Sequence, residues 1–382
     1  MTNADYIKSL DSSAFATNGI FYGKRIIIAG GGTGGHIFPA IAIANEIRIQ
    51  HPDTKILFVG ANGKMEMEKV PAAGYDITGL DIAGYNRSSL LKNITLPFKL
   101  IKSFMQVRSI LSAFKPDAVI GVGGYSSFPV LRWAQTRGIA TFIHESNSLA
   151  GKSNIMLGKR AKKIFVAGYG MEKYFPADKL LMTGNPIRTE LAEIKISRIE
   201  GLNFFGLKDQ KTVLVVGGSL GAKSINEAIL KNIDVFKKKN IQLIWQTGKS
   251  FAPDAARMEE DKTHIWTNSF INNMEYAYAA ADVVVSRAGA MAVSELCAVG
   301  KAVIFVPYPH AAEDHQTANA SSLVAKRAAV LIADSEVDEK LVDTILQLIN
   351  DETMANDLGR NIKQLSSVNA DKIIVSEIFG SI

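Results

Sequence analysis

A strand, a glycine-rich loop and a helix follow one another at two places in this chain. The first unit begins with the apolar run Arg25–Ala29 and continues into Gly30–Gly35. The second begins with Val213–Val216 and continues into Gly217–Ala222. In such a unit the glycines let backbone N–H groups approach a phosphate, and the dipole of the following helix favours negative charge there. Each half of the chain therefore predicts an α/β domain with an anion site after its first strand.

Further apolar runs recur between helical stretches in both halves, which is typical of parallel sheets covered by helices. A chain of 382 residues is long enough for about two such domains. Glycine and proline in Gly184–Arg188 suit a hinge between them. We therefore expect two Rossmann-like, doubly wound domains that face a cleft. Their expected bounds are an extension over 1–22, a first domain over 23–186, a second over 187–362, and a closing helix over 363–382 that packs back on the first. The expected strands are Ile26–Ala29, Ile56–Val59, Ala118–Val122, Thr141–His144, Lys163–Val166, Val213–Val216, Gln242–Trp245, Ala281–Ser286 and Ala302–Pro307.

Composition narrows the class of protein. Hydrophobic residues make up 47% and charged residues 21%, so the chain can bury sizeable cores. The single cysteine, Cys297, fits a reducing compartment, and we expect a small buried helix residue there. A net charge of +6 is too small to indicate nucleic acid, but it suits an anionic substrate or an anionic membrane face. Apolar runs are shorter than the roughly 20 residues that span a bilayer, and residues 1–22 lack the pattern of a signal peptide. We expect a cytosolic protein that touches a membrane without crossing it.

Two familiar nucleotide motifs resemble these loops. Gly30, Gly32 and Gly35 match the spacing of a dinucleotide site, but that site needs an acid at the end of the next strand, where Phe58–Gly63 has none. The second loop imitates a P-loop, yet Ala222 stands where a P-loop requires glycine. Both interpretations are disfavoured. Glycines that serve only tight strand–helix packing remain the structural alternative.

A longer series of motifs is more specific. The chain contains, in this order, Gly31–His36, Gly123–Tyr125, His144–Asn147, Gly184–Arg188, Gly217–Ala222, Arg287–Ala290, Val293–Glu295 and Asp314–Gln316. This series resembles the MurG family of peptidoglycan glycosyltransferases, over about residues 24–375. The resemblance implies a glycosyltransferase B-type fold and transfer of N-acetylglucosamine from UDP-N-acetylglucosamine to undecaprenyl-pyrophosphoryl-N-acetylmuramoyl-pentapeptide, with inversion at the anomeric carbon. It implies no cofactor and no bound metal.

The resemblance also implies the residues that meet the donor, most of them in the second domain. Glu295 would hold the ribose hydroxyls, Ser219 would lie near the diphosphate and Ile271 on the uracil side. Gln316 would meet the sugar, with His315 beside it, and which of the two holds the sugar is left open. Asp314 and His315 fit simple loop capping equally well. Serine at Ser146 and histidine at His315 depart from the glutamines usual in the family. The implied donor contacts are Thr33, Gly34, Gly35, Asn147, Arg188, Ser219, Ile271, Ala290, Met291, Ala292, Val293, Ser294, Glu295 and Gln316.

His36 is the candidate general base for the acceptor hydroxyl. A helix N-terminus disfavours the imidazolium, so the neutral, proton-accepting form should prevail near pH 7. A histidine that orders the glycines or binds substrate phosphate is the alternative, and Glu145 is a rival base. Arg188 would either add a cationic contact to the diphosphate or brace the hinge. Glu295 could instead be a first-turn acid favoured by the helix dipole.

The stretch Ile82–Phe114 mixes apolar and basic residues, and Pro97 is placed to open a helix there. We expect Leu90, Leu91 and Lys92 to face the membrane, which a lipid-linked acceptor requires the enzyme to approach. The alternative is that the helical spacing of Phe98, Ile101, Met105 and Phe114 marks a core face. The resemblance further implies a peripheral protein on the cytoplasmic face of the inner membrane, with roles in cell shape and division and with cell-wall synthesis proteins as partners.

Three other functions fit parts of the pattern. A diacylglycerol glycosyltransferase has a similar fold. A UDP-N-acetylglucosamine epimerase also places a nucleotide sugar between two such domains and would invert the sugar without a lipid acceptor. A membrane-docked scaffold that binds nucleotide sugar would bind without transfer.

Overall fold

The structure is a computed structural model that describes residues 23–82, 96–168, 170–188, 191, 193–218, 221–251, 264–311, 314–367 and 369–382, with 96–99 described for their backbone alone. The chain forms two compact units, one of Met1–Pro186 with Asn369–Ile382 and one of Ile187–Val368. Predictions made for residues 1–22, for Leu90, Leu91 and Lys92, and for Ser219 lie outside the described residues.

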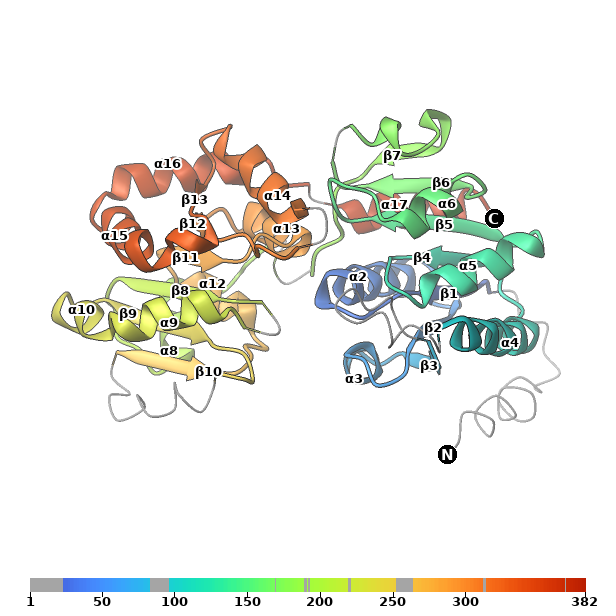
Figure 1. Cartoon of the computed structure of the whole chain (residues 1–382), viewed down its shortest axis with the longest axis horizontal. Coiled ribbons are helices and arrows are strands. Elements are labelled where there is room, and N and C mark those ends of the chain that lie inside the picture. The colour runs from blue at the N-terminus through green and yellow to red at the C-terminus, as the bar shows by residue number, and fades with distance from the viewer. Residues whose placement is uncertain are drawn as a thin grey trace. The chain divides into compact units, whose positions relative to one another are not determined.

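The first unit contains a seven-stranded parallel sheet in the order β3-β2-β1-β4-β5-β6-β7 (Figure 1). Along its central strand, β1, successive side chains pack alternately into two different hydrophobic cores. Ile27 packs with the cluster that includes helices α4 and α5, whereas Ile26 and Ile28 pack with the cluster that includes α2 and α17. Both faces of the sheet are therefore covered by helices, which explains why its strands read as continuous apolar runs. The elements are β1 Arg25–Ala29, α2 Gly34–Gln50, β2 Lys55–Ala61, α3 Glu66–Ala72, β3 Asp76–Leu80, α4 Leu96–Phe114, β4 Ala118–Gly121, α5 Ser127–Thr136, β5 Ala140–Glu145, α6 Lys152–Gly158, β6 Lys163–Val166, β7 Leu180–Met182 and α17 Ala370–Phe379, with short 3-10 turns at Met171–Lys173 and Ala177–Lys179.

The second unit repeats this plan with a six-stranded parallel sheet in the order β10-β9-β8-β11-β12-β13. On β8, Val213 and Val215 pack on one side with α9 and α15, and Leu214 packs on the other with α8 and α12. The elements are α8 Arg198–Phe204, β8 Thr212–Val216, α9 Lys223–Lys231, α10 Ile233–Lys238, β9 Gln242–Gln246, β10 Ile265–Asn268, α12 Met274–Ala280, β11 Val283–Ser286, α13 Ala290–Val299, β12 Ala302–Phe305, α14 His315–Val324, β13 Val330–Leu331, η6 Asp334–Glu336, α15 Val337–Asn350 and α16 Glu352–Lys363.

The predicted fold class of two doubly wound parallel-sheet domains is confirmed. Every strand that the apolar runs predicted is present within a few residues of its expected bounds. The prediction of a helix opened by Pro97 is confirmed by α4, which begins at Leu96. Helix α2 begins at Gly34, directly after the first glycine loop, and contains Pro39. That the two domains face a cleft stays a prediction.

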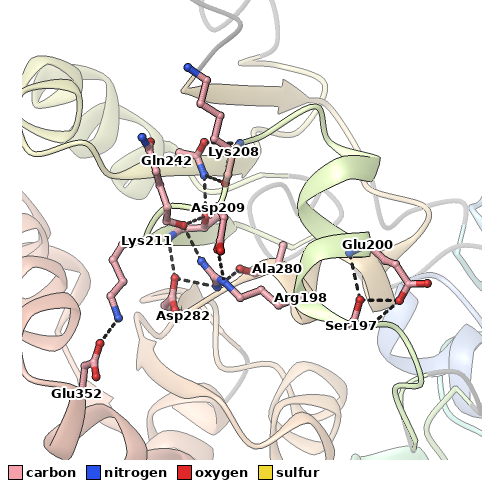
Figure 2. Close-up of polar contacts among 12 residues, drawn as sticks. Ser197, Arg198, Glu200, Lys208, Asp209, Lys211, Gln242, Ala280, Asp282 and Glu352 are labelled. Carbon is pink, nitrogen blue, oxygen red and sulfur yellow. Dashed lines mark hydrogen bonds and ion pairs between the residues drawn. The ribbon is translucent and has the colours of Figure 1, made fainter.

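Polar contacts organise the amino ends of β8 and β11 (Figure 2). Arg198 of α8 donates to the carbonyls of Ala280 and Gln210 and pairs with Asp282 at 3.1 Å. Asp282 accepts in turn from the amide of Thr212 at 2.7 Å. One arginine therefore joins α8, the end of α12 and the starts of two strands. This edge of the sheet lies opposite the glycine loop that follows β8.

Candidate active site

The first glycine loop is held mainly by its own backbone amides. Gly30 N–H donates to the carbonyl of Val59 at 3.1 Å, and Gly31 N–H donates to that of Gly123 at 3.2 Å. The N–H groups at the start of a helix have no partner within the helix. An anion would therefore meet the loop at its later part, Thr33–Gly35, where α2 begins.

Glu66 shapes this loop, and sequence reasoning missed it. Its side chain is 1% exposed; Oε2 accepts from Gly32 N–H at 2.8 Å and Oε1 from Ala61 N–H at 2.9 Å. A Cβ on Gly31 would lie 2.3 Å from Oε1, so this glycine makes room for the carboxyl group. The acid comes from the first turn of α3 and folds back onto the loop. Because it binds the protein backbone, it is not the ribose-binding acid of a dinucleotide site, and that interpretation stays disfavoured.

His36 lies in the first turn of α2 rather than on the loop. Its Nδ1 is 3.0 Å from the carbonyl oxygen of Gly31 and 3.4 Å from the hydroxyl of Thr33. A carbonyl oxygen can only accept, so Nδ1 carries the proton and the basic lone pair is on Nε2. The neighbouring glycine loop lies against the ring, since a Cβ on Gly123 would be 2.7 Å from Nε2. The ring is thus oriented with its proton-accepting nitrogen away from Gly31.

Glu145, the rival base, ends β5 with its side chain buried. Oε1 accepts from the backbone and side-chain amides of Asn147 at 3.1 and 3.3 Å. Oε2 accepts from Gly151 N–H at 3.0 Å and from Asn154 Nδ2 at 2.9 Å. Both oxygens are engaged with the loop that carries Asn147. This environment favours a role in shaping that loop over one in taking a proton from substrate.

His144 precedes Glu145 and is fully buried. Burial is the main reason that the pKa of His144 is lowered to about 4; the backbone of Gly184 opposes this shift and the nearby ring of His36 adds to it. The imidazole is therefore neutral near pH 7. The hydroxyl of Ser146 lies 3.5 Å from its Nδ1.

In the second unit, Arg188 and Glu295 form a bidentate ion pair. Arg188 Nε lies 3.0 Å from Oε1 and Nη2 lies 3.1 Å from Oε2 of Glu295, and the two side chains are 23% and 9% exposed. Two parallel N–H···O bonds fix the plane of the carboxylate. The negative charge of Glu295 and burial together raise the pKa of Tyr278, with burial the larger cause. Arg188 therefore orients the carboxylate of Glu295 in this structure, and its roles at the diphosphate and at the hinge stay predictions.

Glu295 projects from the second turn of α13, which begins at Ala290 after the carboxyl end of β11. The interpretation of Glu295 as a first-turn acid is wrong, because the helix begins five residues before it. Ala290, Met291 and Ala292 form the first turn, whose N–H groups have no partner within the helix. Val293 N–H donates to Gly289 at 2.9 Å, so Val293 and Ser294 continue the regular helix.

The sugar-side candidates lie at the start of α14. Gln316 accepts from the amide of Tyr308 at 2.9 Å through Oε1, which ties this helix to the loop after β12. Asp314 is the N-cap residue and accepts from the hydroxyl of Thr317 at 2.7 Å. His315 is the first helical residue. Asp314 thus occupies the N-cap position, but its side chain makes no capping hydrogen bond to the helix, so its capping role stays a prediction.

The P-loop interpretation fails on the contacts of Ser224, the residue that would hold magnesium. Its hydroxyl donates to Asp334 at 2.6 Å and accepts from Arg287 at 3.2 Å. Lys223 is exposed and pairs with Glu227 on the next turn. Neither side chain is arranged for a nucleoside triphosphate.

Further sequence predictions concern the cysteine, metal ligands, membrane-spanning helices and the face of α4. Cys297 is buried in α13, as expected, and burial raises the pKa of its thiol to about 12. Within the described ranges, His, Cys, Asp and Glu side chains form no group of three that could hold a metal ion. Among the helices described, none is both long and apolar enough to cross a bilayer. On α4, Ile101 and Met105 are 60% and 62% exposed, so their predicted core role is wrong, whereas Phe114 is buried.

Comparison with known proteins gives the class first. Residues 26–166 match the glycosyltransferase family 28 N-terminal domain, and residues 212–373 match the C-terminal domain of the same family. Together with the fold, these matches define a two-domain glycosyltransferase of family 28.

Individual relatives narrow this class. A protein of Parabacteroides distasonis named UDP-N-acetylglucosamine–N-acetylmuramyl-(pentapeptide) pyrophosphoryl-undecaprenol N-acetylglucosamine transferase is 50% identical over 357 residues, covering 93% of this chain and 97% of that protein. One of the same name from Flavobacterium psychrophilum is 50% identical over 355 residues, covering 93% and 96%. A solved structure of MurG from Acinetobacter baumannii has a TM-score of 0.70 at 29% identity, covering 94% of this chain and 99% of that one. The chain belongs to the MurG family of N-acetylglucosaminyltransferases.

A UDP-N-acetylglucosamine 2-epimerase structure also resembles the chain, with a TM-score of 0.63, 15% identity, and coverage of 94% and 96%. At that identity the likeness shows the fold alone.

Proposed function

We propose that this protein transfers N-acetylglucosamine from UDP-N-acetylglucosamine to undecaprenyl-pyrophosphoryl-N-acetylmuramoyl-pentapeptide, inverting the anomeric carbon. The observation that carries the proposal is that relatives named for this reaction are half identical to the chain over nearly the full length of both. The epimerase alternative is less favoured, because its likeness is confined to the fold at 15% identity. The relatives reported above are named for the muramyl-pentapeptide acceptor rather than for diacylglycerol.

In the proposed mechanism the second unit holds the donor. The ribose hydroxyls bond to the carboxylate of Glu295, which Arg188 holds in a fixed plane. The diphosphate lies against the loop Gly217–Ala222, with Ser219 near it, and the first turn of α13 adds N–H groups at the nucleoside segment. Ile271 meets the uracil side, and Gln316 with His315 meets the sugar. Stabilising the leaving diphosphate with preorganised N–H groups lowers the barrier to departure of UDP.

His36 takes the proton from the acceptor hydroxyl as that oxygen attacks the anomeric carbon. The contact between its Nδ1 and Gly31 supports this role, because it leaves the lone pair on Nε2. The N–H groups of Thr33, Gly34 and Gly35 and the amide of Asn147 complete the contacts proposed for the first unit.

The protein acts at the cytoplasmic face of the inner membrane as a peripheral enzyme, where its lipid-linked acceptor lies. The exposed apolar side chains Leu100, Ile101 and Met105 on α4 support an approach to the bilayer, and Leu90, Leu91 and Lys92 precede that helix in the chain. Through this reaction it serves cell-wall synthesis, cell shape and division, with other cell-wall synthesis proteins as partners.

A transfer assay tests the proposal. Purified protein receives radiolabelled UDP-N-acetylglucosamine together with the undecaprenyl-linked muramoyl acceptor, diacylglycerol, or no acceptor. We expect label in lipid only with the muramoyl acceptor. Label on diacylglycerol, or an epimerised nucleotide sugar without any acceptor, would replace the proposed function with one of its alternatives.

A further inference from the structure

Gln246 lies where two loops proposed to hold the donor come together. It is the last residue of β9, the strand between β8 and β10. The glycine loop that starts at Gly217 follows β8, and the loop that carries Ile271 follows β10. Parallel strands end at the same edge of a sheet, so both loops pass beside the side chain of Gln246.

The amide of Gln246 bonds to both loops at once. Its Nε2 donates to the carbonyl of Gly218 at 2.9 Å, and its Oε1 accepts from the amide of Ile271 at 2.9 Å. The residue is 3% exposed. A buried amide with both ends bonded has little freedom to turn, and loss of either bond leaves a buried polar group unsatisfied.

The two bonded positions belong to different parts of the donor site. Gly218 precedes Ser219, proposed for the diphosphate, whereas Ile271 is proposed for the uracil side. We propose that Gln246 is a positioning residue that sets the separation between the diphosphate loop and the uracil loop, and so makes the site fit a whole uridine diphosphate. This inference rests on the proposed function. It assigns Gln246 no contact with the substrate itself.

The same strand provides a matched control. Gln242 begins β9 at the opposite edge of the sheet and is 0% exposed. Both ends of its side-chain amide are hydrogen-bonded (Figure 2). Its Oε1 accepts from Lys208 N–H at 2.9 Å, and its Nε2 donates to the Lys208 carbonyl at 2.8 Å. A second buried, doubly bonded amide therefore lies on the same strand, at the edge away from the proposed donor loops.

Binding of UDP and of uridine to the purified full-length protein tests the contributions of the two loops separately. Gln246→Glu keeps an acceptor for Ile271 but turns a second oxygen toward the Gly218 carbonyl. We expect UDP to bind about tenfold more weakly to this variant, with uridine binding within twofold of wild type. Gln246→Asn keeps the amide but is one methylene shorter and cannot span both loops, so UDP binding should also weaken about tenfold. The KM for UDP-N-acetylglucosamine should rise in both variants more than kcat falls.

Gln242→Asn should lower the melting temperature while UDP binds within twofold of wild type. Melting curves establish whether each variant is folded. If Gln246→Glu does not fold, Gln246→Asn tests the inference in its place. UDP affinities unchanged in a folded Gln246 variant would overturn the inference, as would equal weakening of UDP and uridine by Gln246→Glu. Failure of the wild-type protein to bind UDP would instead overturn the proposed function, and this inference with it.

Discussion

Replacing Glu66 with glutamine should destabilise the first unit and disturb the loop that carries the candidate base. The carboxyl group accepts two backbone hydrogen bonds, from Gly32 and Ala61, and is 1% exposed. Glutamine offers one acceptor oxygen, so its NH₂ group must face one of the two N–H donors. A buried donor left without a partner costs about 2 kcal/mol. For a unit of this size that corresponds to a fall in melting temperature of about 4–8 °C.

Scanning calorimetry on the full-length protein measures this shift, and Glu68→Gln is the matched control. Glu68 lies two residues further along α3, is 74% exposed and pairs only with Lys69 at 3.5 Å. Its replacement should change the unfolding free energy by less than about 0.5 kcal/mol. Equal melting temperatures for the Glu66 and Glu68 variants would refute the assignment of Glu66 as the residue that holds the loop.

Variants of His36, of His144 and of the exposed face of α4 have the following expected outcomes. His36→Ala should reduce turnover by about 10²-fold or more with donor affinity kept; near-normal turnover would remove His36 from the role of base. Burial lowers the pKa of His144 from 6.5 to about 4, so the folded protein resists protonation of this imidazole. The free energy of unfolding should therefore be full above pH 6.5 and fall by about 3 kcal/mol as the pH drops to 4. His144→Asn should flatten this part of the profile measured by urea unfolding, and an unchanged profile would contradict the role given to His144. Replacing Ile101 and Met105 together with serine should reduce flotation with anionic liposomes, whereas Ile199→Ser, at a 48% exposed position on the second unit, should not; equal flotation of all variants would count against the α4 surface.

The strands were predictable because both faces of each sheet are buried, so each strand is a short, continuous apolar run. Less regular elements gave weaker signals. Leu180–Met182 lies at the edge of its sheet and is only half-buried, and Val330–Leu331 has two residues. A run of two or three residues carries no period that distinguishes a strand from a loop.

The acid beside the first glycine loop was not predictable from the strand alone. The search for a ribose-binding acid ends at Gly63, whereas Glu66 comes from the next helix and reaches back to Gly32. The signal was present in the glycine at Gly60 and in Gly31, because a Cβ at either position would overlap Glu66. The sequence shows these two glycines, but their contacts with Glu66 can be recognised only in the folded structure.

Gln246 illustrates a signal that the sequence did offer. A polar residue that ends an apolar run, Gln242–Gln246, and lies 3% exposed must find hydrogen-bond partners within the protein. Which partners it finds depends on the order of the strands. The order β10-β9-β8 places the two loops on either side of this residue, and that order is a property of the whole sheet.

A crystal structure of the protein with bound UDP-N-acetylglucosamine tests the central claim most directly. We expect the ribose hydroxyls on Glu295, the uracil beside Ile271 and the diphosphate against the loop that begins at Gly217. A nucleotide bound instead at the start of α2, with these three positions in the second unit unoccupied, would contradict it.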